Sequence, residues 1–143
     1  MKMKRFVKTF TLILCIVLIA VTALFANGCA REPLPEGMPE NVQKLGEGET
    51  QFYFIVADKD GNSKGYDIKT SKTVVGDALL ELGLIAGDEG QFGLYVKTVD
   101  GITADYDVDG TYWAFYENGQ YAQAGVDTTE IVPGTVYTFK VEK

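Results

Sequence analysis

The chain has 143 residues, a formal net charge of -7 and no histidine. Its first 28 residues hold four of the thirteen basic residues and none of the twenty acidic ones, so the remainder carries nine basic residues against twenty acidic and a net charge near -11. Such a remainder repels nucleic-acid phosphates, and we expect no nucleic-acid partner. Because histidine, the usual acid–base group near neutral pH, is missing, we expect that the protein is not an enzyme.

Residues 1–28 have the layout of a bacterial lipoprotein signal peptide. A basic stretch is followed by the apolar stretch Phe10–Phe25, and small residues precede Cys29. We predict cleavage before Cys29 and lipidation of its thiol, which would leave an exported lipoprotein on the outer side of the cell membrane. The alternatives are an ordinary signal peptide or an uncleaved anchor, although sixteen apolar-dominated residues are shorter than the about 20 that a membrane span needs.

Residues 29–48 contain three of the four prolines among Glu, Gly and Asn, without apolar periodicity. We expect a flexible tether here, followed by one domain over residues 49–143. The other cysteine, Cys15, lies in the expected leader. The domain therefore has no thiol for a disulfide or a metal site.

The first elements predicted in the domain are two strands and a helix, and the helix is recognised by a change in the spacing of apolar residues. Aromatic and β-branched residues at 50–57 predict a strand, residues 58–62 a turn, and residues 66–70 the returning strand. Apolar residues at helical spacing then predict one short helix, with Thr73 as N-cap and Gly83 at the left-handed position of a Schellman ending. The helix carries Val75, Ala78, Leu79 and Leu82 on one face.

Five further strands are predicted after the helix, separated by turn-forming pairs such as Asn118-Gly119, which tolerates the two positive φ angles of a type I′ turn. These strands cover residues 92–99, 102–106, 112–117, 120–124 and 136–141. The order predicts an α+β fold of β-grasp type, with a mostly antiparallel sheet and one short helix. An all-β sandwich is the alternative.

A calcium site is suggested by three carboxylates at alternate positions, Asp105, Asp107 and Asp109, followed by Gly110. This matches the first half of a calcium-binding loop, in which oxygen ligands converge and a glycine permits a tight turn. The second half does not match, because the expected bidentate glutamate is replaced by Tyr116. A solvated acidic turn is therefore the favoured interpretation, and calcium is the alternative.

The aromatic run at 112–116 is the most distinctive part of the domain. In a strand, Trp113 and Phe115 face one side, whereas Tyr112 and Tyr116 face the other. Both sides cannot belong to the core of a sheet covered on one face, so we expect some of these rings to meet a planar ligand or a protein partner. The rings predicted to bind a ligand are those of Tyr112, Trp113, Phe115 and Tyr116.

Five segments together resemble the C-terminal β-domain of transcobalamin and intrinsic factor, over about residues 50–143. They are Thr73–Leu79, Gly93–Val96, Tyr112–Gly119, Gly125–Asp127 and Pro133-Gly134. Bacterial lipoproteins that carry such a domain form a family catalogued as being of unknown function. The resemblance implies a β-grasp-like domain that closes over cobalamin from one side. It also implies that Tyr112, Trp113 and the hairpin turn at Asn118 and Gly119 face the ligand, which adds these two turn residues to the predicted ligand-binding residues.

The chain differs from the vitamin carriers in two respects. It has no counterpart of their helical barrel, which forms the other half of the pocket, and no histidine that could coordinate cobalt. We therefore expect a lipid-anchored module that binds a cobalamin-like or other planar ligand beside a transporter or a helical partner protein, as an accessory to uptake. The alternative is a surface module that binds another protein and no small molecule.

Overall fold

The computed structural model describes residues 33–143. The expected signal peptide, residues 1–28, and Cys29 lie outside this part. Residues 35–143 form one compact unit. No helix within the described residues is long and apolar enough to cross a bilayer.

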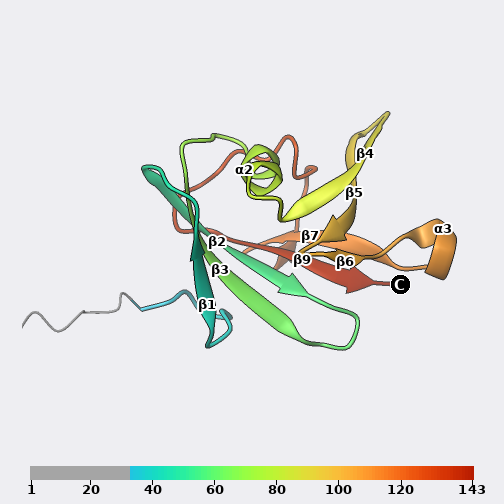
Figure 1. Ribbon diagram of the computed structural model, residues 1–143, viewed down its shortest axis with the longest axis horizontal. Helices are drawn as coiled ribbons and strands as arrows, with labels where there is room; N and C mark the ends of the chain where they lie inside the picture. The colour runs from blue at the N-terminus through green and yellow to red at the C-terminus, as the bar shows by residue number, and fades with distance from the viewer. Residues whose placement is uncertain (1–32) are drawn as a thin grey trace, which may run out of the picture. The chain divides into compact units, whose positions relative to one another are not determined.

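The larger of two sheets has six strands in the order β1-β3-β2-β9-β7-β8 (Figure 1). Its centre is a parallel pair, β2 with β9, and β1 also pairs in parallel with β3. The remaining pairs are antiparallel. The strands are β1 (Val42–Leu45), β2 (Thr50–Ala57), β3 (Ser63–Thr70), β7 (Tyr112–Glu117), β8 (Gln120–Tyr121) and β9 (Val136–Glu142).

The smaller sheet has the order β4-β5-β6, with β4 (Ile85–Gly90), β5 (Gly93–Val99) and β6 (Ile102–Thr103). Two helices, α2 (Val75–Glu81) and the four-residue α3 (Tyr106–Asp109), complete the described residues. In Figure 1 the β4–β5 hairpin extends away from the larger sheet, and α2 lies across from that sheet. The part of the chain that the structure describes is thus mostly β-strand, with two sheets and few helices.

The core is formed by alternate residues of the central strands, which pack against one face of α2. Phe52 and Phe54 of β2 are fully buried and contact Tyr137 and Phe139 of β9 edge to face. Burying such rings supplies the main stabilising free energy of a domain without disulfides. The buried Tyr137 hydroxyl also donates to the Glu130 carbonyl and accepts from the Val132 amide.

Helix α2 ends as predicted but begins differently. Gly83 has a φ of 66°, its amide donates to the Leu80 carbonyl, and the Leu84 amide donates to the Leu79 carbonyl. These are the two hydrogen bonds of a Schellman ending. The prediction of Thr73 as N-cap is wrong, because Val74 occupies that position without a side-chain hydrogen bond. Instead, the Val75 and Gly76 amides donate to the Thr129 and Val126 carbonyls, so a distant segment satisfies the helix start.

Several strands differ from those predicted. Val42–Leu45, expected in the tether, forms β1 along the edge of the large sheet. The glycine-rich segment Ile85–Gly90 forms β4 because it pairs with β5 in a hairpin. The strand expected over 102–106 ends at Thr103, since the Asp105 side chain accepts from the Asp107 amide and starts helix α3. Strand β8 ends at Tyr121 rather than Ala124.

Candidate functional site

A hollow of about 300 Å³ lies beside strand β7. Trp113 and Phe115 line it from β7, Leu94 and Val96 from β5, and residues 121–126 form its remaining wall, together with Tyr95 and Phe139. Trp113 and Phe115 are only 7% and 8% exposed. None of the lining side chains in the described part of the chain is charged. We call this feature the β7 hollow.

The wall of the β7 hollow is held by a turn at Gly125–Thr128. The Asp127 carboxylate accepts a hydrogen bond of 3.2 Å from the Leu94 amide of β5. On its other side, the Val126 carbonyl accepts from the Gly76 amide at 2.8 Å. A Cβ atom on Gly76 would lie 2.9 Å from the Asp127 Cα atom, so the absence of a side chain permits this close approach. The turn thereby joins α2 to β5.

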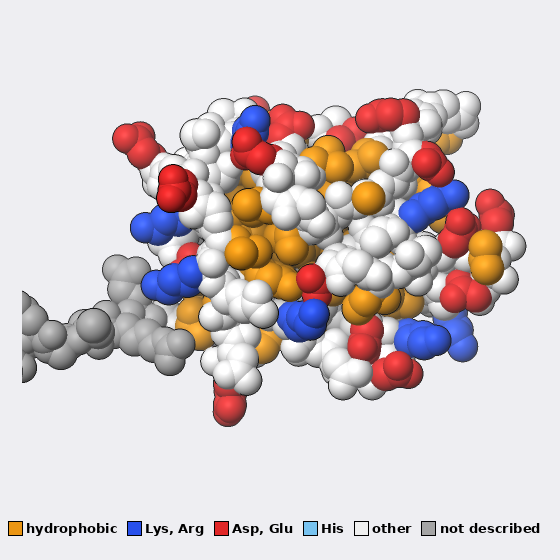
Figure 2. All heavy atoms as spheres, viewed as in Figure 1, with side chains coloured by type: hydrophobic (Ala, Val, Ile, Leu, Met, Phe, Trp, Pro, Cys, Tyr) orange, Lys and Arg blue, Asp and Glu red, His pale blue; other side chains and the backbone are white. Residues whose placement is uncertain are grey.

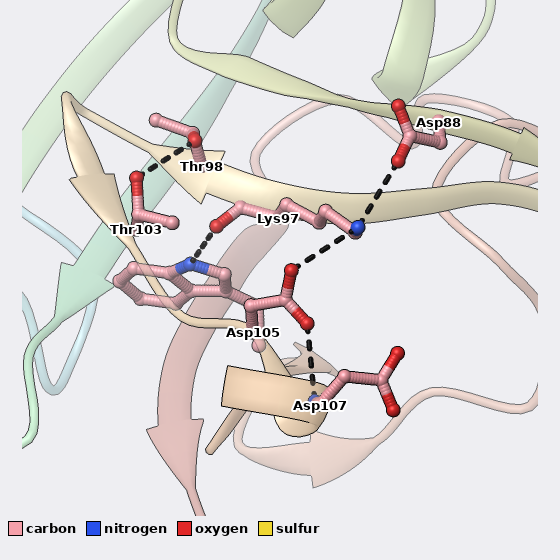
Figure 3. Close-up of polar contacts among 7 residues, drawn as sticks. Asp88, Lys97, Thr98, Thr103, Asp105 and Asp107 are labelled. Atoms are coloured by element: carbon pink, nitrogen blue, oxygen red, sulfur yellow. Dashed lines mark hydrogen bonds and ion pairs between the residues drawn. The ribbon is translucent and has the colours of Figure 1, made fainter. Parts of the chain in front are cut away.

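Trp113 connects the two sheets through its indole nitrogen, which donates to the Lys97 carbonyl of β5 at 3.2 Å. In Figure 3 the Lys97 ammonium lies between Asp88 and Asp105, at 3.1 Å from a carboxylate oxygen of each. Hydrogen bonds to Asp88 and then to Asp105 raise the pKa of Lys97 above its ordinary value. This ion-paired group fixes β4, β5 and the start of α3 beside the indole ring.

The predicted ligand-binding residues do not lie on one surface. Trp113 and Phe115 line the β7 hollow, whereas Tyr112 and Tyr116 project from the opposite face of the same strand, where both hydroxyls donate to Glu142. Asn118 and Gly119 form the β7–β8 turn and both have positive φ, as a type I′ turn requires. The Asn118 side chain accepts from the Val136 amide and so attaches this turn to β9.

Two of the three carboxylates of the predicted calcium site, those of Asp105 and Asp109, already have other hydrogen-bond or ion-pair partners. Asp105 caps α3 and pairs with Lys97, and Asp109 accepts from the amide and hydroxyl of Thr111. These hydrogen bonds from Thr111 lower the pKa of Asp109. Within residues 33–143 no three His, Cys, Asp or Glu side chains are close enough together to hold a metal ion. The calcium prediction therefore gains no geometric support.

Two residues that position the hollow were missed by sequence reasoning. Asp127 and Gly76 lie in two of the segments that resemble the transcobalamin β-domain, Gly125–Asp127 and Thr73–Leu79, but the sequence predicted no contact for either. A glycine inside a short helix destabilises that helix relative to alanine. Its presence there therefore indicates that another backbone segment approaches closely. The partner of that approach could not be read from the sequence, because Gly76 and Val126 are fifty residues apart.

Charge is distributed unevenly over the domain. Figure 2 shows acidic side chains spread around the edges of the visible face and apolar side chains gathered toward its centre. An uncharged hollow in an acidic domain does not attract an anion and offers no carboxylate ligand to a metal ion. The geometry suits an uncharged, apolar or aromatic group.

These features define a β-rich domain with an aromatic hollow. Residues 72–143 match the family described as "Domain of unknown function (DUF4430)", and the chain belongs to this family. The matched part runs from the segment before α2 to the last residue and includes every residue that lines the β7 hollow. A comparison with curated proteins gives no match.

The solved structures that are similar to this chain include the following two. A protein from Ruminococcus gnavus, provisionally described as metal binding, has a TM-score of 0.63 at 24% identity and covers 66% of this chain and 98% of its own. Haptocorrin in complex with Cbi has a TM-score of 0.50 at 15% identity, over 69% of this chain and 26% of the haptocorrin chain. At these identities the likeness concerns the fold alone. It agrees with the expected resemblance to the transcobalamin-like β-domain.

Proposed function

We propose that the protein is an exported, lipid-anchored binding module in which the β7 hollow receives part of a small planar ligand, with a cobalamin-like molecule as the first candidate. The observation that carries this proposal is the hollow itself, which two aromatic side chains of β7 line without charged groups. Trp113 is held by the hydrogen bond that it donates to the Lys97 carbonyl, and Phe115 by packing against Tyr137 and Phe139. Rigid aromatic walls supply contact area at little entropic cost. No catalytic role is proposed.

The size of the hollow favours a shared binding site. Ligand pockets generally enclose about 300–1,000 Å³, so a hollow of about 300 Å³ would admit an edge or a substituent of a large planar ligand. A second protein would then cover the rest of that ligand. A transporter or a separate helical protein at the cell membrane is the partner that we propose.

The topology supports a β-grasp-like arrangement as the finer description of the fold. Strands β3-β2-β9-β7-β8 place the first and last strands of this group in the centre as a parallel pair. The connection from β3 to the later strands carries α2, whose buried residues belong to the core. The similarity to haptocorrin in complex with Cbi is the reason to test a corrinoid as the first ligand.

Fluorescence of the full-length chain in an uncharged detergent tests this function. Trp113 is the only tryptophan and it lines the hollow, so a corrinoid that enters should quench its emission saturably after correction for corrinoid absorbance. Ala124→Leu should weaken the quenching, because Ala124 is an exposed lining residue and a larger side chain would fill the space. Ala86→Leu is the matched control, since Ala86 is exposed on β4 and does not line the hollow.

Absence of quenching up to about 1 mM corrinoid, a concentration that would detect even weak affinity, would overturn the corrinoid proposal. Equal effects of the two leucine variants would show that binding occurs elsewhere. The anchor is tested separately with Cys29→Ser, which should transfer the protein from the membrane fraction to the soluble fraction. Retention in the membrane fraction would contradict lipidation at Cys29.

A protein-interaction module is the second candidate, favoured by one specific feature. Phe92, at the tip of the β4–β5 hairpin, is 92% exposed. A fully exposed phenylalanine on a projecting hairpin is more typical of a contact with another protein than of a folded monomer surface. Loss of partner capture in Phe92→Ser, with unchanged quenching by a corrinoid, would favour this alternative.

A further inference from the structure

A second group of aromatic residues lies on the outer face of the large sheet, opposite the β7 hollow. Tyr116 and Tyr121 face each other across β7 and β8, with ring centroids 5.4 Å apart and planes inclined by 74°. Tyr112 lies four residues before Tyr116 on the same face of β7 and directly opposite Glu142 of β9. We call Tyr112, Tyr116, Tyr121 and Glu142 the outer tyrosine cluster.

The carboxylate of Glu142 is the centre of this cluster. One of its oxygens accepts a hydrogen bond of 2.6 Å from the Tyr116 hydroxyl, and the other lies 3.5 Å from the Tyr112 hydroxyl. The second contact is long, so that oxygen keeps capacity for a stronger partner. The side chain is 27% exposed, which leaves it accessible from solvent.

The charge states of the cluster favour a cation. The hydrogen bond from Tyr116 lowers the pKa of Glu142, so its carboxylate is ionised at neutral pH. The same hydrogen bond, together with burial, raises the pKa of Tyr116 to about 12 and keeps the phenol neutral. One negative charge therefore lies among electron-rich rings, which is the combination that recognises ammonium groups.

The chain itself places an ammonium group at this carboxylate. The Lys140 side-chain nitrogen lies 3.4 Å from the Glu142 oxygen that Tyr116 also contacts. The Lys140 side chain is 55% exposed, and an exposed pair of this kind contributes little free energy. Lys140 can consequently be displaced by another cation at small cost.

We propose that the outer tyrosine cluster is a weak binding site for a compact organic cation of the quaternary ammonium class. Glu142 supplies the charge, the rings of Tyr116 and Tyr121 supply cation–π contact from two nearly perpendicular sides, and Lys140 acts as an internal competitor. Tyr121 also borders the β7 hollow, whereas Tyr112, Tyr116 and Glu142 do not line it and lie on the opposite face of the sheet. The charged part of the site is therefore separate from the hollow. It does not depend on the function proposed for that hollow.

Amide chemical shifts of the ¹⁵N-labelled full-length chain in a maltoside detergent test this proposal, with choline as the probe. Choline should shift the amide signals of residues 112–121 and 140–142 saturably, at concentrations up to about 50 mM, the range expected for a few weak contacts. Its uncharged carbon analogue, dimethylbutanol, should shift them much less. Equal shifts with the two compounds would show ordinary apolar or hydroxyl recognition and would overturn the proposal.

Three variants locate the site. Glu142→Gln keeps an acceptor for the Tyr116 hydroxyl but removes the charge, and it should weaken choline binding about tenfold. Tyr121→Leu changes an exposed ring and should weaken binding about threefold. Lys140→Gln should strengthen binding, because it removes the competitor. Unchanged affinity in Glu142→Gln, or no shift of any signal with choline in the unaltered chain, would overturn the proposal.

Discussion

The two faces of strand β7 differ in how their aromatic side chains are held. On the inner face, Phe115 packs against Tyr137 and Phe139, with ring centroids 6.0 and 5.0 Å away. On the outer face, Tyr112 and Tyr116 contact the Glu142 carboxylate through their hydroxyls. Residues that alternate along six positions of one strand thus have different environments, because successive side chains point to opposite sides of a sheet.

Aromatic residues of the same strand therefore have different structural roles on its two faces. Trp113 and Phe115 contribute to the core and at the same time line the β7 hollow. Tyr112 and Tyr116 are half-buried, and their hydroxyls contact the ionised carboxylate of Glu142. Changes on the inner face should therefore affect folding first, and changes on the outer face should affect local polar contacts first.

The largest expected effect is that of Phe115→Ala. Removal of a buried ring that contacts two core rings should lower the free energy of unfolding by about 3 kcal/mol. Urea denaturation measures this loss. Tyr112→Ala, on the outer face of the same strand, is the matched control and should cost about 1 kcal/mol or less. Equal losses in both variants would remove the distinction between the faces.

Asp127→Ala should have the next largest effect, because it leaves the Leu94 amide without its side-chain acceptor. The expected loss of stability is about 1–2 kcal/mol, the cost of a partly buried donor without a partner. Hydrogen exchange should accelerate at the Leu94 amide and in residues 125–128. Glu89→Ala, an exposed change on β4, should leave this exchange unaltered, and a slow Leu94 amide in Asp127→Ala would contradict the role of Asp127.

Tyr116→Phe isolates the hydroxyl on the outer face. Loss of its hydrogen bond to Glu142 should cost about 1 kcal/mol, and the phenol titration of the protein should change as well. Tyr66 and Tyr116 have their pKa raised to about 12, so the variant should lose one of the two latest phenol transitions in ultraviolet absorbance. Tyr121→Phe should retain both. An unaltered titration in Tyr116→Phe would contradict the assignment of one of these late transitions to the Tyr116 hydroxyl.

The smallest expected effect is on how the free energy of unfolding depends on pH in acid, to which the carboxylate of Glu142 contributes. Its folded-state pKa is lowered, first by the hydrogen bond from Tyr116. The resulting stabilisation is present above the pKa of an unfolded glutamate, about 4.3, and is lost as the pH falls through the lower folded-state value. Glu142→Gln should therefore differ from the unaltered chain in urea midpoint at neutral pH and converge with it at low pH. A difference that stays constant with pH would contradict this origin.

Local sequence signals were sufficient where neighbouring residues decide the structure. The aromatic and β-branched residues at 50–57 and the aromatic run within 112–117 predicted β2 and β7 with their observed bounds. Gly83 predicted the end of α2, and Asn118-Gly119 predicted a turn with two positive φ angles. In each case the relevant hydrogen bonds or φ restrictions involve residues only a few positions apart.

Local signals failed where a distant partner supplies the hydrogen bonds. Strand β4 has little strand propensity and exists because β5 pairs with it. Val42–Leu45 reads as linker and becomes a strand because β3 offers a free edge. The acidic run beginning at Asp105 resembles half a calcium loop, whereas its first carboxylate caps a helical turn and pairs with Lys97.

The sequence by itself determined that the domain is β-rich and that aromatic residues with two opposite orientations gather on one strand. It could not determine which orientation faces the core, because both alternating sets contain aromatic side chains and local periodicity is the same for either choice. Only the tertiary structure decided this, by placing Phe139 and Tyr137 of β9 against Phe115 and Glu142 of β9 beside Tyr116. The physical reason is that burial is a property of the packed assembly of strands, not of any one of them.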